Sequence, residues 1–131
     1  GVLGTSNYYF YYPETPQNQA FVKDFQAAFD RPPKVGALYG YITATFIARA
    51  FEKAGEVDTE KFIDALEGMI VDSPVGPLTL RAYDHQVMFP MFMGVTKKSP
   101  EYDFLVASEI VTIPGEEVMP TVDEIKKARG E

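Results

Sequence analysis

The chain has 131 residues, the length of one compact domain, and 46% of them are hydrophobic, as in globular proteins. Its net charge of -7 repels phosphate backbones and anionic lipid head groups, which argues against nucleic acids and membrane surfaces as partners. It contains no cysteine, which excludes disulfides, Cys-based zinc sites and a thiol nucleophile. No apolar stretch is long enough to cross a bilayer.

The first half of the chain predicts one extended segment and three helices. Residues 1–12 are rich in small and aromatic side chains, which favours extended structure. Thr15 and Pro16 are typical of a helix start, and three phenylalanines at a spacing of four give that helix one apolar face. Residues 35–53 predict a second helix with apolar side chains around most of its circumference, so we expect it to pack on more than one side. A third, shorter helix begins at Asp58 or Thr59.

The second half of the chain predicts mainly strands. Residues 69–71 and 78–81 are extended segments on either side of a turn at 72–74, and residues 87–93 and 104–113 predict two more strands. Thr121 and Glu124 form a capping-box pattern for a closing helix over residues 122–129. One strand, three helices, several strands and a helix, in that order, are unusual for a lone compact domain unless its fold is α+β.

Few residues offer catalytic chemistry. His85 is the one histidine, and it follows Asp84 in a turn, where a hydrogen bond to backbone is the simplest role. The acidic pairs at 116–117 and 123–124 flank a turn and a helix start, which favours a solvated or helix-dipole role over acid–base catalysis. No metal-ligand spacing, phosphate loop or dinucleotide-binding pattern is present, so we expect no cofactor.

The unusual feature of the composition is its aromatic content, with 8 Tyr and 10 Phe. Tyrosine combines apolar area with a hydroxyl group, which suits both a ligand cleft and the rim of a core. The tyrosines gather in two places, the run at residues 8–12 and the pair Tyr39 and Tyr41.

The order and spacing of several segments resemble the C-terminal part of the periplasmic branched-chain amino acid binding proteins. The resemblance covers nearly the whole chain. Its segments are YPETPQNQAFV at 12–22, the prolines at 32–33, GYITA at 40–44, AFEKAG at 50–55, DTEKFIDALEG at 58–68, SPVGPLTLR at 73–81 and DHQ at 84–86.

This resemblance implies a type I periplasmic binding fold, in which two α/β lobes joined by hinge strands close on a ligand. The chain would form part of one lobe, incomplete on its own, as the C-terminal fragment of a two-lobed protein. Within residues 1–131, the implied parts are a hinge-proximal strand at 1–13, a helical part at 14–68, strands at 69–115 and a C-terminal segment at 116–131.

The resemblance also implies a function: an extracytoplasmic or periplasmic solute-binding component of an ABC transporter, not an enzyme. The ligand would be a branched-chain or related amino acid, or a small carboxylate or amide, and the partner an ABC permease. By position, the ligand-binding candidates are Tyr8 and Tyr9 near the hinge, and Leu38, Tyr39 and Tyr41 at the start of the central helix. The alternatives are a ligand-sensing domain of a receptor or regulator with the same fold, and a hydrolase or other enzyme that uses Asp84, His85 and a distant carboxylate.

The sequence has neither an initiator methionine nor a signal peptide and begins directly with strand-like residues. We therefore expect it to belong to a larger protein. Its helices also present more apolar surface than its few strands can cover, so self-association of the fragment is a further expectation.

Overall fold

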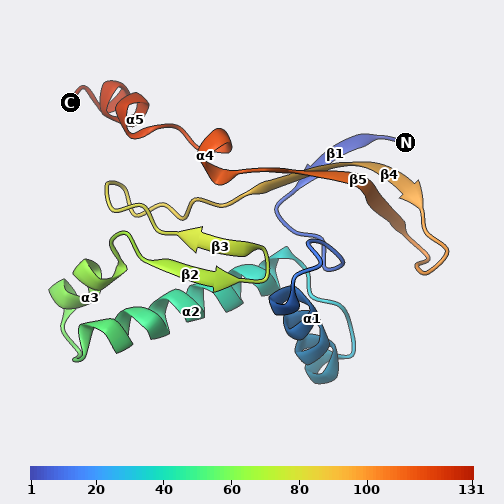
Figure 1. The fold of residues 1–131 in the computed structure, drawn as a ribbon, viewed down its shortest axis with the longest axis horizontal. Helices are drawn as coiled ribbons and strands as arrows, with labels where there is room; N and C mark the ends of the chain where they lie inside the picture. Colours follow the sequence, from blue (N-terminus) through green and yellow to red (C-terminus); the bar gives the residue numbers. More distant parts are fainter. The chain divides into compact units, whose positions relative to one another are not determined.

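The computed structural model describes residues 1–131 and divides them into two compact units. The first unit joins Gly1–Tyr9 to Phe89–Glu131, and the second unit is Phe10–Met88. Along the chain, a first strand is followed by helices and then by the other strands, and the chain closes with short helices (Figure 1). The predicted mixture of helices and strands is confirmed. No helix is both long enough and apolar enough to cross a membrane.

The three predicted helices of the second unit are confirmed as α1 (Pro16–Phe29), α2 (Val35–Ala54) and α3 (Thr59–Leu66). The Thr15 side chain accepts the N–H of the third helical residue of α1, and Asp58 does the same for α3. These side chains satisfy N–H groups that have no partner within the helix, which is why both helices begin where they do.

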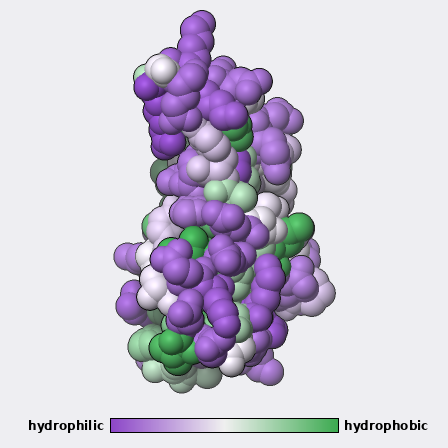
Figure 2. Space-filling view, turned by 90° about the vertical axis from the view of Figure 1, so that its left-hand side faces the viewer, coloured by the Kyte–Doolittle hydropathy of each residue, from purple (hydrophilic) through white to green (hydrophobic).

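Helix α2 supplies the core of the second unit through one stripe of side chains at a spacing of four. Large side chains outside this stripe remain 41–48% exposed. Two of them still contact neighbouring helices, because the Tyr41 ring centroid lies 4.9 Å from that of Phe21 on α1 and the Phe51 ring centroid lies 4.6 Å from that of Phe62 on α3. Helix α2 therefore packs on more than one side, as expected, with part of each of these side chains left in solvent. Figure 2 shows apolar side chains reaching the surface among polar ones. The buried stripe consists of Leu38, Ile42, Phe46 and Ala50, and the exposed side chains are Tyr39, Tyr41, Ile47 and Phe51.

A two-stranded antiparallel hairpin, β2 (Ile70–Ser73) and β3 (Gly76–Thr79), completes the second unit. Its loop is Pro74 and Val75, so the turn lies further along the chain than the predicted 72–74. The Ser73 hydroxyl explains this shift, because it donates to the Gly76 carbonyl (2.6 Å) and accepts the Val75 N–H (3.2 Å) across the loop.

The first unit contains a three-stranded antiparallel sheet in the order β1 (Leu3–Ser6), β4 (Met91–Lys98) and β5 (Leu105–Ile113). The predicted strand at 104–113 is confirmed. The predicted extended segments at 1–12 and 87–93 are correct only in part, because β1 ends at Ser6 and β4 begins at Met91. Alternation of side chains indicated extended structure there, but only pairing with a neighbour fixes where a strand begins and ends.

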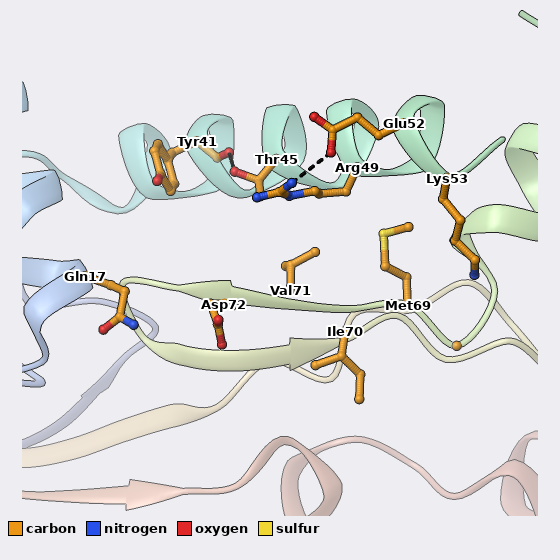
Figure 3. Close-up of a pocket in the computed structure, with 11 residues that line it drawn as sticks. Gln17, Tyr41, Thr45, Arg49, Glu52, Lys53, Met69, Ile70, Val71 and Asp72 are labelled. Carbon is orange, nitrogen blue, oxygen red and sulfur yellow. Dashed lines mark hydrogen bonds and ion pairs between the residues drawn. The ribbon is translucent and has the colours of Figure 1, made fainter. Parts of the chain in front are cut away.

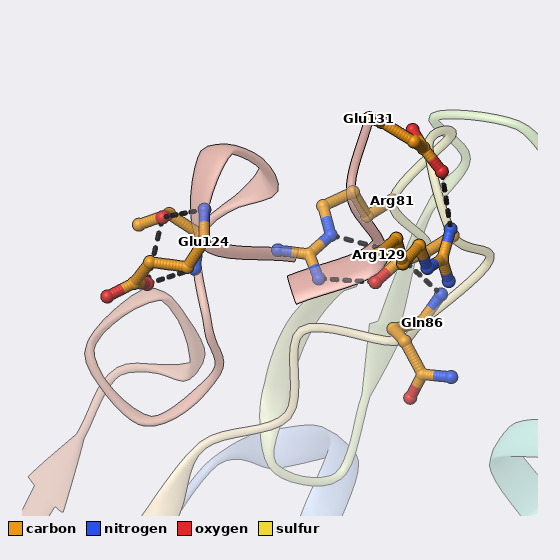
Figure 4. Close-up of polar contacts among 7 residues, drawn as sticks. Arg81, Gln86, Glu124, Arg129 and Glu131 are labelled. Atoms are coloured by element: carbon orange, nitrogen blue, oxygen red, sulfur yellow. Dashed lines mark hydrogen bonds and ion pairs between the residues drawn. The ribbon is translucent and has the colours of Figure 1, made fainter. Parts of the chain in front are cut away.

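The chain closes with two short helices, α4 (Gly115–Val118) and α5 (Val122–Arg129). The predicted capping box at the start of α5 is confirmed: Thr121 Oγ1 accepts the Glu124 N–H, and the Glu124 carboxylate accepts the Thr121 N–H (Figure 4). These hydrogen bonds lower the pKa of Glu124.

Candidate functional site

An open groove of about 1010 Å³ lies in the second unit between α2 and β2 (Figure 3). One wall comes from α2, one end from α1, and the other wall from β2 and the two residues before it. Its lining residues are Gln17, Tyr41, Thr45, Arg49, Glu52, Lys53, Gly68, Met69, Ile70, Val71 and Asp72.

The α2 wall is a row of side chains at a spacing of four, which places Tyr41, Thr45 and Arg49 on one face of the helix. The Thr45 hydroxyl donates to the Tyr41 carbonyl (2.9 Å), one turn back. Arg49 Nη1 pairs with Glu52 Oε2 at 2.8 Å, and both side chains are well exposed, at 65% and 63%. An exposed pair of this kind leaves most of the guanidinium open to solvent or to a ligand.

The wall formed by β2 alternates between core and solvent. Val71 is buried, whereas Ile70 and Asp72 are exposed. At the far end of the groove, Lys53 Nζ donates to the Ala65 carbonyl (3.0 Å), which ties α2 to α3. The groove therefore presents positively and negatively charged side chains, a tyrosine ring and the edge of β2 to a bound molecule.

A second, smaller groove of about 400 Å³ runs along α1 and shares Tyr41 with the first. It is mainly aromatic: the Phe21 and Tyr41 ring centroids are 4.9 Å apart, and those of Phe25 and Phe29 are 4.5 Å apart. The Arg31 guanidinium lies 5.7 Å from the centre of the Phe25 ring. The predicted apolar face of α1 is thus present, but it becomes more exposed along the helix, until Phe29 is 58% exposed.

Two of the predicted ligand-binding residues lie in the first unit. Tyr8 is buried, and its backbone forms a small turn with Ser6, whose hydroxyl donates to the Tyr8 carbonyl (3.0 Å). Burial raises the pKa of the Tyr8 hydroxyl, because it disfavours the phenolate. Tyr9 is half-buried. A ligand role for both remains a prediction.

The other three candidates lie on α2 in different environments. Leu38 is fully buried in the core stripe, whereas Tyr39 and Tyr41 are 43% and 48% exposed. Tyr39 and Tyr41 are two positions apart, which corresponds to about 200° around a helix with 3.6 residues per turn. Their side chains therefore face different directions. Of the three, only Tyr41 lines the grooves described above, and ligand contact by any of them stays a prediction.

His85 lies in a turn with a left-handed backbone (φ 57°), and its backbone N–H donates to the Arg81 carbonyl (2.9 Å). Its ring contacts a carboxylate as well, with Nε2 lying 3.1 Å from Glu67 Oε1. The Asp84 carboxylate is held instead by Arg81, at 2.8 Å and 2.5 Å (Figure 4). This pairing lowers the pKa of Asp84 to about 2. Asp84 therefore braces the turn rather than orienting His85.

The two acidic pairs at 116–117 and 123–124 lie at helix starts, where a helix-dipole role is expected. The pair Glu116 and Glu117 lies in the first turn of α4, and Asp123 and Glu124 lie in the first turn of α5. No group of three or more His, Asp or Glu side chains could hold a metal ion.

Of the residues that line the larger groove, sequence analysis selected only Tyr41. Gln17 and Asp72 are polar residues beside ordinary turn and helix signals, and their local sequence does not distinguish them from other surface residues. Thr45 and Arg49 could have been selected, because they follow Tyr41 at a helical spacing of four.

Three comparisons place the chain among known proteins. Residues 1–100 match the family model described as periplasmic binding protein. A solved ABC-type branched-chain amino acid transporter from Rhodopseudomonas palustris CGA009 superposes with a TM-score of 0.81, at 33% identity over 89% of this chain. A solute-binding protein from R. palustris, solved in complex with 4-hydroxybenzoate, gives a TM-score of 0.74 at 25% identity over 86% of the chain.

A curated relative adds to this likeness. The leucine-, isoleucine-, valine-, threonine- and alanine-binding protein of Pseudomonas aeruginosa is 36% identical over 67 residues, or 51% of this chain. The chain spans 18% of that relative, and 32% and 31% of the two solved proteins. Because the family model matches most of its length, the chain belongs to the periplasmic binding protein family.

Proposed function

We propose that this chain acts within the periplasmic or extracytoplasmic solute-binding component of an ABC transporter. The ligand would be a branched-chain or related amino acid, or a small carboxylate or amide, enclosed by lobe closure and delivered to the permease. The observation that carries the proposal is the likeness to the R. palustris transporter protein, with 33% identity and a TM-score of 0.81 over 89% of the chain.

We further propose that the protein binds its ligand without chemical turnover. Two observations support this proposal: the Asp84 carboxylate next to His85 is held by Arg81, and the His85 ring and the Glu67 carboxylate that it contacts are both well exposed, at 53% and 42%. Tyr39 and Tyr41 have exposed rings and are the predicted residues best able to contact a ligand, whereas Leu38 supports the helix from the core.

The test is a thermal-shift screen followed by calorimetry, using the protein at its full encoded length. The panel contains leucine, isoleucine, valine, threonine, alanine, 4-hydroxybenzoate and a neutral amide. We expect a saturable rise in melting temperature with at least one of them, and an unchanged ligand by chromatography after incubation. A folded protein that binds none of them would refute the transport proposal, and conversion of the ligand would refute binding without turnover.

Site-directed variants test the tyrosines. Tyr41→Ala and Tyr39→Ala should weaken binding of any ligand found, whereas Ile47→Ala, a truncation at a similarly exposed position on α2, should leave affinity unchanged. Equal affinity in all four proteins would remove Tyr39 and Tyr41 from the binding site.

A further inference from the structure

A buried asparagine holds the backbone at the end of the aromatic run of residues 8–12. The Asn18 side chain is 2% exposed, and its Nδ2 donates to two carbonyls, those of Phe10 and Pro13, each at 3.0 Å. Asn18 itself belongs to the first turn of α1. One side chain of a regular helix therefore fixes both ends of the segment from Phe10 to Pro13.

The other side of the run is held by a hydroxyl group. Ser6 Oγ donates to the Tyr8 carbonyl (3.0 Å) and accepts the Tyr8 N–H (3.2 Å). The chain passes from the first unit to the second directly after Tyr9. Side-chain hydrogen bonds therefore fix the backbone on each side of Tyr9, at Tyr8 and at Phe10.

These hydrogen bonds order a part of the chain that regular structure does not. The residues between the end of β1 at Ser6 and the start of α1 at Pro16 belong to no helix or strand of the fold. A ladder of backbone hydrogen bonds therefore does not hold them, and the side chains of Ser6 and Asn18 take this role.

We propose that Asn18 is a positioning residue for ligand binding, which acts by fixing the backbone that carries Tyr9. This inference rests on the proposed solute-binding function and on the predicted ligand role of Tyr9. Of the two tyrosines predicted near the hinge, Tyr8 is already buried within this chain, at 5% exposure, whereas Tyr9 is half-buried. Tyr9 is thus the one with side-chain area left for a ligand.

The expected contribution to affinity comes from order that exists before the ligand arrives. A binding side chain on an unfixed segment must lose conformational freedom when the ligand binds, and this loss weakens the complex. A side chain that is held by supporting hydrogen bonds has already lost that freedom on folding. Loss of the Asn18 amide should therefore weaken ligand binding even where the protein remains folded.

The chemistry of the amide provides a sharp substitution. Asn18→Asp keeps the shape of the side chain but replaces the donating NH₂ group by a carboxylate oxygen, which faces two carbonyl oxygens. Protonation of this carboxylate restores one O–H donor, and burial favours the neutral form. The variant should therefore bind poorly at high pH and better as the pH falls, which a simple loss of packing does not produce.

The experiment is calorimetry of the protein at its full encoded length, with the ligand found in the solute screen and at temperatures well below melting. At pH 8 we expect Asn18→Asp to raise the dissociation constant about tenfold, as for the loss of one or two hydrogen bonds. At pH 5 the ratio of its dissociation constant to that of the wild-type protein should be severalfold smaller.

Ser73→Ala is a matched control in the same unit. Ser73 is also buried, at 3% exposure, and its hydroxyl also forms two hydrogen bonds, but these lie within the β2–β3 loop. This variant should lower the melting temperature and leave the ligand dissociation constant unchanged at both pH values.

A double-mutant cycle tests whether Asn18 acts through Tyr9. Asn18→Ser is neutral and offers one donor where the amide offers two, so it should also weaken binding, and it replaces Asn18→Asp if circular dichroism shows that the latter does not fold. In a Tyr9→Ala background, Asn18→Ser should cause no further loss of affinity, because the positioned side chain is absent.

Several results would overturn the proposal. Unchanged affinity in the folded Asn18 variants would leave Asn18 with a structural role alone. An equal loss of affinity in Ser73→Ala would indicate general loosening of the second unit, and additive losses in the double-mutant cycle would show that Asn18 does not act through Tyr9. A wild-type protein that binds none of the solutes would refute the proposed function itself, and this inference with it.

Discussion

The two units are held together by different interactions. The second unit is built on side chains that meet in a core: Leu38 and Ala50 have no exposed area, and Phe46 is 5% exposed. The sheet of the first unit leaves many large side chains in solvent, including Leu3 at 63%, Leu105 at 60% and Val111 at 55%. Most of the buried apolar side chains lie in the second unit, whereas the first buries Tyr8, Phe92 and Val106. The first unit therefore relies more on strand pairing and on the close approach of its backbones.

The largest expected effect tests burial in the second unit. Phe46→Ala should lower the free energy of unfolding by about 3–5 kcal/mol, because it removes a large apolar side chain and leaves a cavity. The neighbouring Ile47, which is 44% exposed, provides the control, and Ile47→Ala should cost far less. Urea denaturation followed by circular dichroism measures both. Equal losses would mean that the α2 stripe is not the core of this unit.

The next effect tests backbone approach in the first unit. Gly94 lies at an irregularity between β4 and β5, where an added Cβ would be 2.9 Å from the Ser108 carbonyl oxygen and 3.1 Å from Ala107 Cβ. Gly94→Ala should therefore lower the free energy of unfolding by about 1–3 kcal/mol, the usual range for overpacking.

Gly4 is a matched control for this substitution. It pairs directly with Gly94 across β1 and β4, but a Cβ there would meet no atom within 4 Å. Gly4→Ala should be neutral or slightly stabilising, because alanine restricts the unfolded chain. If both alanines had the same effect, close packing at the bulge would not be the cause.

The smallest effect concerns the Arg81–Asp84 ion pair. This pair stabilises a turn of the second unit through an electrostatic interaction, whereas the core of that unit is stabilised by buried apolar side chains. Pairing lowers the pKa of Asp84 from 3.8 to about 2, so its stabilising contribution is complete above pH 4 and is lost as the pH falls toward 2. Asp84→Asn should flatten this part of the pH–stability profile. Glu67→Gln, which changes another carboxylate near the same turn, should leave it in place.

Local signals in the sequence predicted α1, α3 and α5 well because a side chain caps the start of each, whereas α4 has no capping side chain and was not predicted. Thr15, Asp58 and Thr121 all cap the helices expected of them, and Gly55 ends α2 in a left-handed conformation (φ 74°). These effects depend on residues within one turn of each other, which a linear sequence displays directly.

Strand limits and the candidate site were harder to predict because both depend on residues distant in sequence. The alternation at 87–93 indicated extended structure, but β4 begins at Met91, where pairing with Ile113 starts. The helical pattern of α2 likewise gave no reason to prefer Tyr41 over Tyr39 as a ligand-binding residue. Only the packing of α1 and β2 around the helix shows that Tyr41 borders both grooves.

One hydroxyl group links the start of α1 to the hairpin loop. Thr15 Oγ1 accepts the Asn18 N–H (3.0 Å) and donates to the Pro74 carbonyl (3.1 Å), 59 residues away. The helix start can form locally, but the second bond forms only once the hairpin is in place. The Asn18 amide should therefore exchange with deuterium at a rate that reports opening of the hairpin as well as fraying of the helix.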